Sequence, residues 1–381
     1  MRTLSPLPLT QQLPTLPMLL RALHLSLALS LGSLTLAGCG LLVPAPAVTE
    51  PVMVRPPPAP IAAPAARDAP WADATGEVVG SGERLLVYMP RKGDTLRGLA
   101  ARFLGQAGNA WQIDEANGQG GEPVPGRPLV VPLVSRNPLG ISTTGMQTVT
   151  VLCYHRFGAD TSKMVVSPFR FEEQMAYLAL NGFHVVRLTD LEAFMAGERA
   201  LPAKSVVITF DDGYESVYRH AFPVLKKYSF PATLFVYSDF IGARDALTWP
   251  QFKEMVRSGL VDLQAHSKTH RNLAERQPGE TDETYRKNID GELRAPRAML
   301  EKRMAPLGVR VRQFAYPFGA ANDAVLDAMQ RADYELGLTV TAGGNAFFAA
   351  PLMVRRTMIF GDHSLADFQA RLQVQRPLDR P

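Results

Sequence analysis

The chain is poor in cysteine, and its charge is nearly balanced. Cys39 and Cys153 are the two cysteines among its 381 residues, so at most one bridge can form and a disulfide-stabilised scaffold is excluded. The net charge of +4 is small, so composition does not indicate nucleic acid as a partner. Hydrophobic residues make up 46% and charged residues 20% of the chain, which excludes a wholly disordered chain and a membrane protein of many spans.

The first 38 residues have the pattern of an export signal. The leader becomes strongly apolar over residues 22–36, about the length of a secretory hydrophobic region and short of a membrane span. It ends in Leu36-Ala37-Gly38-Cys39, which resembles the lipobox of bacterial lipoproteins. The resemblance implies cleavage after residue 38 and lipidation of Cys39, with the protein anchored in the bacterial cell envelope. Gly40 favours the outer membrane, on its periplasmic side. A buried N-terminal helix with a chance cysteine is the alternative.

Residues 39–80 are expected to be a linker, because the stretch from Pro44 to Pro70 consists mostly of proline and alanine. Such a composition cannot bury a core and favours extended, polyproline-like conformations. The linker would therefore act as a stiff spacer between the anchor and the domains that follow.

Residues 84–133 predict a small module with the order strand, helix, helix, strand. A short apolar run, a turn with helix-capping residues, two helical patterns and a last apolar run follow one another. The module resembles the LysM family through Gly93-Asp94-Thr95-Leu96, Leu99-Ala100, Asn117 and Pro125-Gly126-x-Pro128-Leu129. The resemblance implies binding of peptidoglycan or a related glycan, with Gly93, Asp94, Thr95 and Asn117 as the binding residues.

Residues 148–374 alternate apolar runs with amphipathic helical stretches. Continuous apolar strands joined through helices predict a parallel sheet that is buried on both faces. We expect an α/β fold, a distorted (β/α) barrel of seven or eight strands. In such barrels the chemistry gathers at the carboxyl ends of the strands. The predicted strands are 148–154, 183–188, 205–210, 232–237, 260–265, 311–315, 335–340 and 353–360.

Two of these strands end in residues that suit a metal. The run 205–210 leads directly into Asp211-Asp212-Gly213, and adjacent carboxylates repel each other unless a cation lies beside them. The run 260–265 leads into His266 and, four residues on, His270. Two imidazoles and a carboxylate form a three-ligand set that leaves positions open for water and substrate.

These motifs resemble the polysaccharide deacetylase family, also called carbohydrate esterase family 4 or the NodB homology domain. The matching segments are Thr209-Phe210-Asp211-Asp212-Gly213, His266-Ser267-x-x-His270 and Tyr316-Pro317-Phe318-Gly319. The resemblance implies that Asp212, His266 and His270 hold a divalent metal, usually Zn²⁺, and that Asp211 is the general base. The backbone N–H of Tyr316 is expected to stabilise the oxyanion.

The sequence departs from the family pattern at two places. The arginine that usually orients the catalytic aspartate is replaced by Ala315, and Arg356 is our candidate for its role, with Arg355 as the alternative because adjacent strand residues face opposite sides. The family's C-terminal Leu-x-His motif is missing. His155, at the end of the first strand, is assigned as general acid, as in the circularly permuted branch that includes biofilm poly-N-acetylglucosamine deacetylases. His363 is the second candidate.

The expected function is metal-dependent removal of acetyl groups from N-acetylglucosamine residues of peptidoglycan. Exported poly-N-acetylglucosamine is the alternative substrate. A lipoprotein that binds the cell wall without catalysis is the alternative from another functional class.

Overall fold

The computed structural model describes residues 75–377 except 119, 135–136 and 160–161. The predicted signal peptide, Cys39 and nearly all of the predicted linker lie outside the described residues, so these assignments stay predictions. In the described ranges, no helix is both long enough and apolar enough to cross a bilayer.

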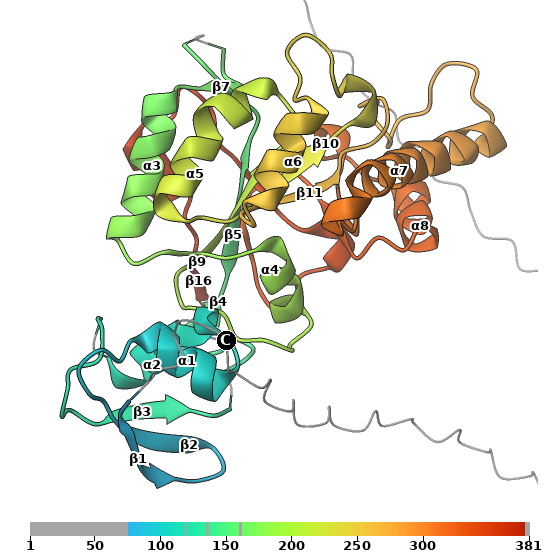
Figure 1. The fold of residues 1–381 in the computed structure, drawn as a ribbon. Coiled ribbons are helices and arrows are strands. Elements are labelled where there is room, and N and C mark those ends of the chain that lie inside the picture. The colour runs from blue at the N-terminus through green and yellow to red at the C-terminus, as the bar shows by residue number, and fades with distance from the viewer. Residues whose placement is uncertain (1–74, 119, 135–136, 160–161, 378–381) are drawn as a thin grey trace, which may run out of the picture. The chain divides into compact units, whose positions relative to one another are not determined.

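Residues 75–132 form a small module around a three-stranded antiparallel sheet of order β1-β2-β3 (Figure 1). Its core is built from apolar side chains of the sheet and of both helices, such as Tyr88, Leu99 and Ile113. The predicted order of strand, helix, helix and strand is found, and β1 precedes it as an additional strand. The elements are β1 (Glu77–Ser81), β2 (Leu85–Met89), α1 (Leu96–Leu104), η1 (Ala107–Asn109), α2 (Ala110–Asn117) and β3 (Leu129–Pro132).

Two of the predicted glycan-binding residues make hydrogen bonds that stabilise this module. The buried carboxylate of Asp94 accepts hydrogen bonds from the backbone N–H of Thr75 and Arg91 and from the Tyr88 hydroxyl. The side-chain amide of Asn117 bonds backbone groups of α2 and β3. The polar groups of Asp94 and Asn117 are thus used inside the module, and their role in glycan binding stays a prediction. Gly93 and Thr95 are exposed, although the Thr95 hydroxyl also caps α1.

The large domain contains most of the strands found in the described residues, and all of those in its central sheet except β14 run parallel to their neighbours. They are β4 (Gly145–Gln147), β5 (Val149–Tyr154), β6 (Arg156–Phe157), β7 (Val165–Val166), β8 (His184–Val185), β9 (Ser205–Phe210), β10 (Ala232–Val236), β11 (Val261–Ala265), β12 (Gln313–Ala315), β13 (Leu336–Leu338), β14 (Gly344–Asn345), β15 (Thr357–Met358) and β16 (Gln375–Pro377).

Helices connect these strands and cover the outside of the sheet (Figure 1). Several begin at polar caps; the Ser167 hydroxyl, for example, accepts the Arg170 N–H at the start of α3. They are α3 (Pro168–Leu180), α4 (Leu188–Met195), α5 (Phe222–Tyr228), α6 (Trp249–Arg257), α7 (Asp282–Met304), α8 (Asp323–Arg331) and α9 (Leu365–Ala370), with the short turns η2 (Val217–Ala221), η3 (Ser238–Phe240), η4 (Ala305–Leu307), η5 (Pro317–Gly319) and η6 (Pro351–Met353).

The central sheet curls into the predicted barrel-like form. Its order is β13-β12-β11-β10-β9-β5-β14, with β15 also paired to β5. A single bridge between Leu338 and Val354 brings the segment before β15 back to β13. The predicted strand 353–360 is wrong in extent, because Pro351 starts a helical turn that runs to Met353 and ladder pairing is limited to Thr357 and Met358.

Alternation along the strands separates two apolar clusters. Leu152 and Tyr154 belong to the large cluster that includes residues of the covering helices, whereas Val151 belongs to a second cluster with Val207 and Phe235. Since successive side chains of a strand face opposite sides, Cys153 and His155 share the side of Val151. The polar side chains at the carboxyl ends of β5 and β9 that face this side therefore lie next to the second cluster, toward the ends of the strands.

Candidate active site

The predicted metal ligands come together at the carboxyl ends of β9 and β11. Asp212 Oδ1 lies 3.4 Å from His266 Nε2 and 3.2 Å from His270 Nε2. One ligand atom from each of the three residues lies within 4.8 Å of the other two. His266 Nδ1 bonds the Ala315 carbonyl at 2.7 Å, which turns Nε2 toward Asp212. The three side chains thus face a common point.

The Asp212 carboxylate fits a bound cation. Its Oδ1 atom is buried and, although two imidazole nitrogens lie 3.2 and 3.4 Å away, it accepts no hydrogen bond from the residues that the structure describes. An orphaned buried oxygen is costly unless something pairs with it. Burial acts to raise the pKa of Asp212, but His266 and His270 outweigh it and hold this pKa well below the ordinary value. The carboxylate is therefore ionised, and its donor set of two imidazoles and one oxygen suits a divalent metal.

Backbone strain is concentrated at this site. Asp212, Ser267, His270 and Phe318 have φ angles of 72°, 75°, 64° and 59°, in the left-handed region that non-glycine residues rarely adopt. Each costs of the order of 1–3 kcal/mol and persists only where the surroundings enforce it. At Gly213, with φ 89°, a Cβ would approach Val236 to 2.9 Å, so glycine is required behind the two aspartates.

Glu292 stabilises the loop that carries His266 and His270. This role could not be predicted from the sequence patterns. Its carboxylate accepts the backbone N–H of Lys268 and of Thr269, and the Thr269 hydroxyl. Glu292 lies on α7 among the buried positions Ile289 and Leu293. A charged residue on the apolar face of a helix was the signal that could have identified it, because a buried carboxylate needs hydrogen-bond donors.

Asp211, the predicted base, forms a buried ion pair with Arg356. The guanidinium NH1 and NH2 groups donate to Oδ1 and Oδ2, both at 2.7 Å. Arg356 Nε donates to the Thr339 carbonyl, and its side chain is fully buried. Burial acts to raise the pKa of Asp211, but Arg356 and then His266 outweigh it and the pKa is lowered. Arg355, the alternative partner, is exposed.

We expect Arg356→Met to lower the free energy of unfolding by about 3–5 kcal/mol, because it leaves Asp211 as an unpaired buried charge. Urea denaturation of metal-free protein measures this change. Arg355→Met is the matched control, and its exposed position predicts a change within about 0.5 kcal/mol. Equal losses in the two variants would show that the ion pair does not matter for stability.

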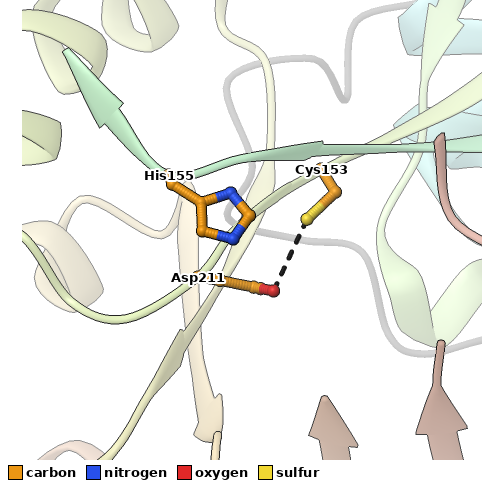
Figure 2. Close-up of side chains that lie close together, drawn as sticks. All are labelled: Cys153, His155 and Asp211. Atoms are coloured by element: carbon orange, nitrogen blue, oxygen red, sulfur yellow. Dashed lines mark hydrogen bonds between the residues drawn. The ribbon is translucent and has the colours of Figure 1, made fainter. Parts of the chain in front are cut away.

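His155 lies beside the proposed base. One nitrogen of His155 lies within 4.8 Å of ligand-type atoms of Cys153 and Asp211 (Figure 2). Burial lowers the pKa of His155, and Asp211 and Asp212 offset this in part. His363 has both ring nitrogens engaged, Nδ1 with the Phe360 N–H and Nε2 with Arg371. The geometry therefore favours His155 as the proton donor.

The backbone N–H of Tyr316, the predicted oxyanion donor, already has a hydrogen-bond partner. This N–H donates to the Leu338 carbonyl at 3.0 Å, so an oxyanion would have to share or displace that bond. The reason is the parallel pairing of β12 and β13, whose last pair joins Ala315 and Leu338. The side chain of Tyr316 does line the cavity, and its hydroxyl bonds the Leu352 carbonyl.

A cavity of about 680 Å³ opens over these groups. This volume lies in the range of small-molecule sites and far exceeds one acetyl group. Its wall combines the proposed metal ligands, base and acid with apolar and aromatic side chains. The lining residues are His155, Met164, Asp211, Asp212, His266, His270, Tyr316, Phe318, Val340, Ala342, Thr357, Met358, Phe360, His363 and Arg371.

The fold and this site together define an α/β barrel hydrolase, with its polar groups at the carboxyl ends of the strands. The family model for polysaccharide deacetylase matches residues 198–337. A solved structure, IcaB from Ammonifex degensii, is 32% identical, and the match covers 60% of this chain and 98% of that one with a TM-score of 0.53. The chain therefore belongs to the polysaccharide deacetylase family, whose members hydrolyse amide C–N bonds.

Two curated relatives carry the same name. The poly-beta-1,6-N-acetyl-D-glucosamine N-deacetylase of Staphylococcus aureus strain MRSA252 is 27% identical over 201 residues, which are 50% of this chain and 67% of that protein. The protein of that name from Escherichia coli strain K12 is 28% identical over 249 residues. The match covers 56% of this chain and only 36% of the Escherichia coli protein.

Proposed function

We propose that the protein is a metal-dependent N-deacetylase that acts on N-acetylglucosamine residues of a cell-envelope polysaccharide. The convergence of Asp212, His266 and His270 beside the Asp211–Arg356 pair, at the floor of one cavity, carries this proposal. Asp212, His266 and His270 would hold the metal, and two nitrogens with one oxygen favour Zn²⁺. When bound, the metal supplies a Lewis acid that activates water and polarises the acetyl carbonyl.

The chain's own residues supply the proton transfers. Asp211 takes a proton from the water whose oxygen adds to the acetyl carbon. As the C–N bond breaks, His155 gives a proton to the leaving nitrogen, so the products are acetate and a glucosamine residue. Arg356 keeps Asp211 ionised and fixes its orientation. The negative charges of Asp211 and Asp212 favour the protonated form of His155, against the effect of burial.

Two polysaccharides remain as substrates, and each has its own support. The names of the Staphylococcus aureus and Escherichia coli relatives favour poly-β-1,6-N-acetylglucosamine. The resemblance of residues 84–133 to LysM modules favours peptidoglycan. We put the exported β-1,6-linked polymer first, because that support comes from the catalytic domain itself. The lipid anchor at Cys39 and a place at the outer membrane complete the proposal.

Acetate release by the purified protein tests this function. We expect activity on β-1,6-linked N-acetylglucosamine oligomers, weaker activity on peptidoglycan fragments, and a loss of at least about 100-fold with a chelator, because the metal contributes several kcal/mol. Adding Zn²⁺ back should restore the rate. Acetate release that is unaffected by complete metal removal would refute metal dependence, and none from any of these glycans would refute the deacetylase.

A further inference from the structure

The proposed chemistry does not use the buried thiol of Cys153, although this thiol lies beside the proposed base, Asp211. Cys153 is on β5, in register with Thr209 of β9 and with Met358 of β15. The strand β5 therefore runs between β9, which leads into Asp211, and the segment that carries Arg356. Figure 2 shows the sulfur aimed at the Asp211 carboxylate, with His155 two residues further along the same strand.

The thiol donates a hydrogen bond to the base. Cys153 Sγ lies 3.4 Å from Asp211 Oδ2, and an ionised carboxylate can only accept. Burial, the largest influence, raises the pKa of the Cys153 thiol well above its usual value, so the S–H proton is kept. Oδ2 therefore receives two donors, the thiol and the NH2 group of Arg356.

The oxygen that the thiol contacts is the one that faces the proposed metal site. Asp211 Oδ2 lies 4.0 Å from Nε2 of the proposed metal ligand His266. The other oxygen, Oδ1, accepts a hydrogen bond from the NH1 group of Arg356. Proton transfer from water requires a carboxylate oxygen held within about 3 Å of that water and correctly turned. The thiol that donates to Oδ2 restrains rotation of the Asp211 carboxylate, independently of the Arg356 guanidinium.

Cys153, His155 and Asp211 also have the residue types of a soft-metal site, and their ligand atoms lie within 4.8 Å of one another. Two observations count against a second metal there. Both oxygens of Asp211 accept hydrogen bonds from Arg356, whose buried positive charge would repel a cation. The Asp212 oxygen of the neighbouring set, in contrast, lacks any hydrogen-bond partner within the described residues.

We propose that Cys153 is a positioning residue, whose S–H group fixes the orientation of the Asp211 carboxylate in concert with Arg356. This inference rests on the proposed function, since it assigns Asp211 as the base. It predicts that a hydroxyl can replace the thiol, whereas a methyl group cannot.

The test compares Cys153→Ala and Cys153→Ser in the acetate-release assay with the zinc-loaded full-length protein. We expect Cys153→Ala to lower kcat about tenfold, or about 1.4 kcal/mol in activation free energy, with KM within about twofold. Cys153→Ser should keep at least about half of the wild-type kcat, because its O–H is a good donor to a carboxylate.

Thermal unfolding separates positioning from a purely structural role. A buried serine is usually more costly to stability than a buried alanine, so a structural role predicts that activity and Tm fall together, most in the serine variant. A positioning role predicts the opposite order for kcat, with the larger loss in the alanine variant. Val151→Ala is the control, because Val151 is buried in the second apolar cluster on the same side of β5 and has no polar group to bond Asp211; its Tm should fall while kcat is unchanged.

A wild-type kcat in Cys153→Ala, or equal losses of kcat in the alanine and serine variants, would overturn the inference while leaving the deacetylase intact. Loss of a second zinc equivalent in Cys153→Ala would overturn it in favour of a metal site. A wild-type protein with no activity on any of the glycans would overturn the proposed function, and this inference with it.

Discussion

Asp211→Asn is expected to lower kcat by at least about 100-fold while the metal content stays unchanged. The substitution removes the group that takes the proton from water but keeps the size of the side chain. Asp212, His266 and His270 are untouched, so the metal should bind as before. Kinetics with zinc-loaded protein, together with metal analysis by mass spectrometry, measure both quantities.

Asp262→Asn is the matched control for this variant. Asp262 lies on β11 near the start of the strand, whereas His266 follows the end of the strand, so its substitution should leave kcat unchanged. Asp211→Asn also removes the charge that balances Arg356, so its fold needs to be checked by circular dichroism. If a folded, metal-loaded Asp211→Asn protein deacetylates at the wild-type rate, Asp211 is not the base.

His266→Ala should empty the metal site and reduce activity to less than about one hundredth. The imidazole is buried and oriented by the Ala315 carbonyl, and alanine has no ligand atom to replace it. The increase in Tm that Zn²⁺ produces in the wild type should disappear as well, because only binding to the folded state stabilises it.

His184→Ala serves as its control, since His184 is an exposed residue of β8, outside the cavity lining. This variant should keep one equivalent of metal and the wild-type rate. Stoichiometric zinc in purified His266→Ala would show that His266 is not a ligand.

The fold class and the proposed metal ligands could be read from local patterns. The strand 205–210 is a nearly continuous apolar run, and in 261–265 apolar residues alternate with Asp262 and Gln264, so both strand ends were visible in the sequence pattern. Strand ends of a parallel sheet meet at one edge, which is why Asp212, His266 and His270 could be expected together. Turn and cap residues likewise predicted the order of elements in residues 84–132.

Whether a particular donor or acceptor atom is free could not be predicted from local sequence patterns. The backbone N–H of Tyr316 is used by a neighbouring strand, and the polar groups of Asp94 and Asn117 are used inside the small module. A motif records residue types, but whether a given donor or acceptor is free depends on its neighbours in space.

The sequence by itself determined which residues could carry the chemistry and at which strand ends they would lie, because periodicity and strand termination are properties of short segments. Only the tertiary structure decided that Arg356 and not Arg355 meets Asp211, that Glu292 supports the histidine loop and that Cys153 lies beneath the base. These contacts join residues that are far apart in the chain, and they depend on the pairing of β15 with β5 and on the way the sheet curls.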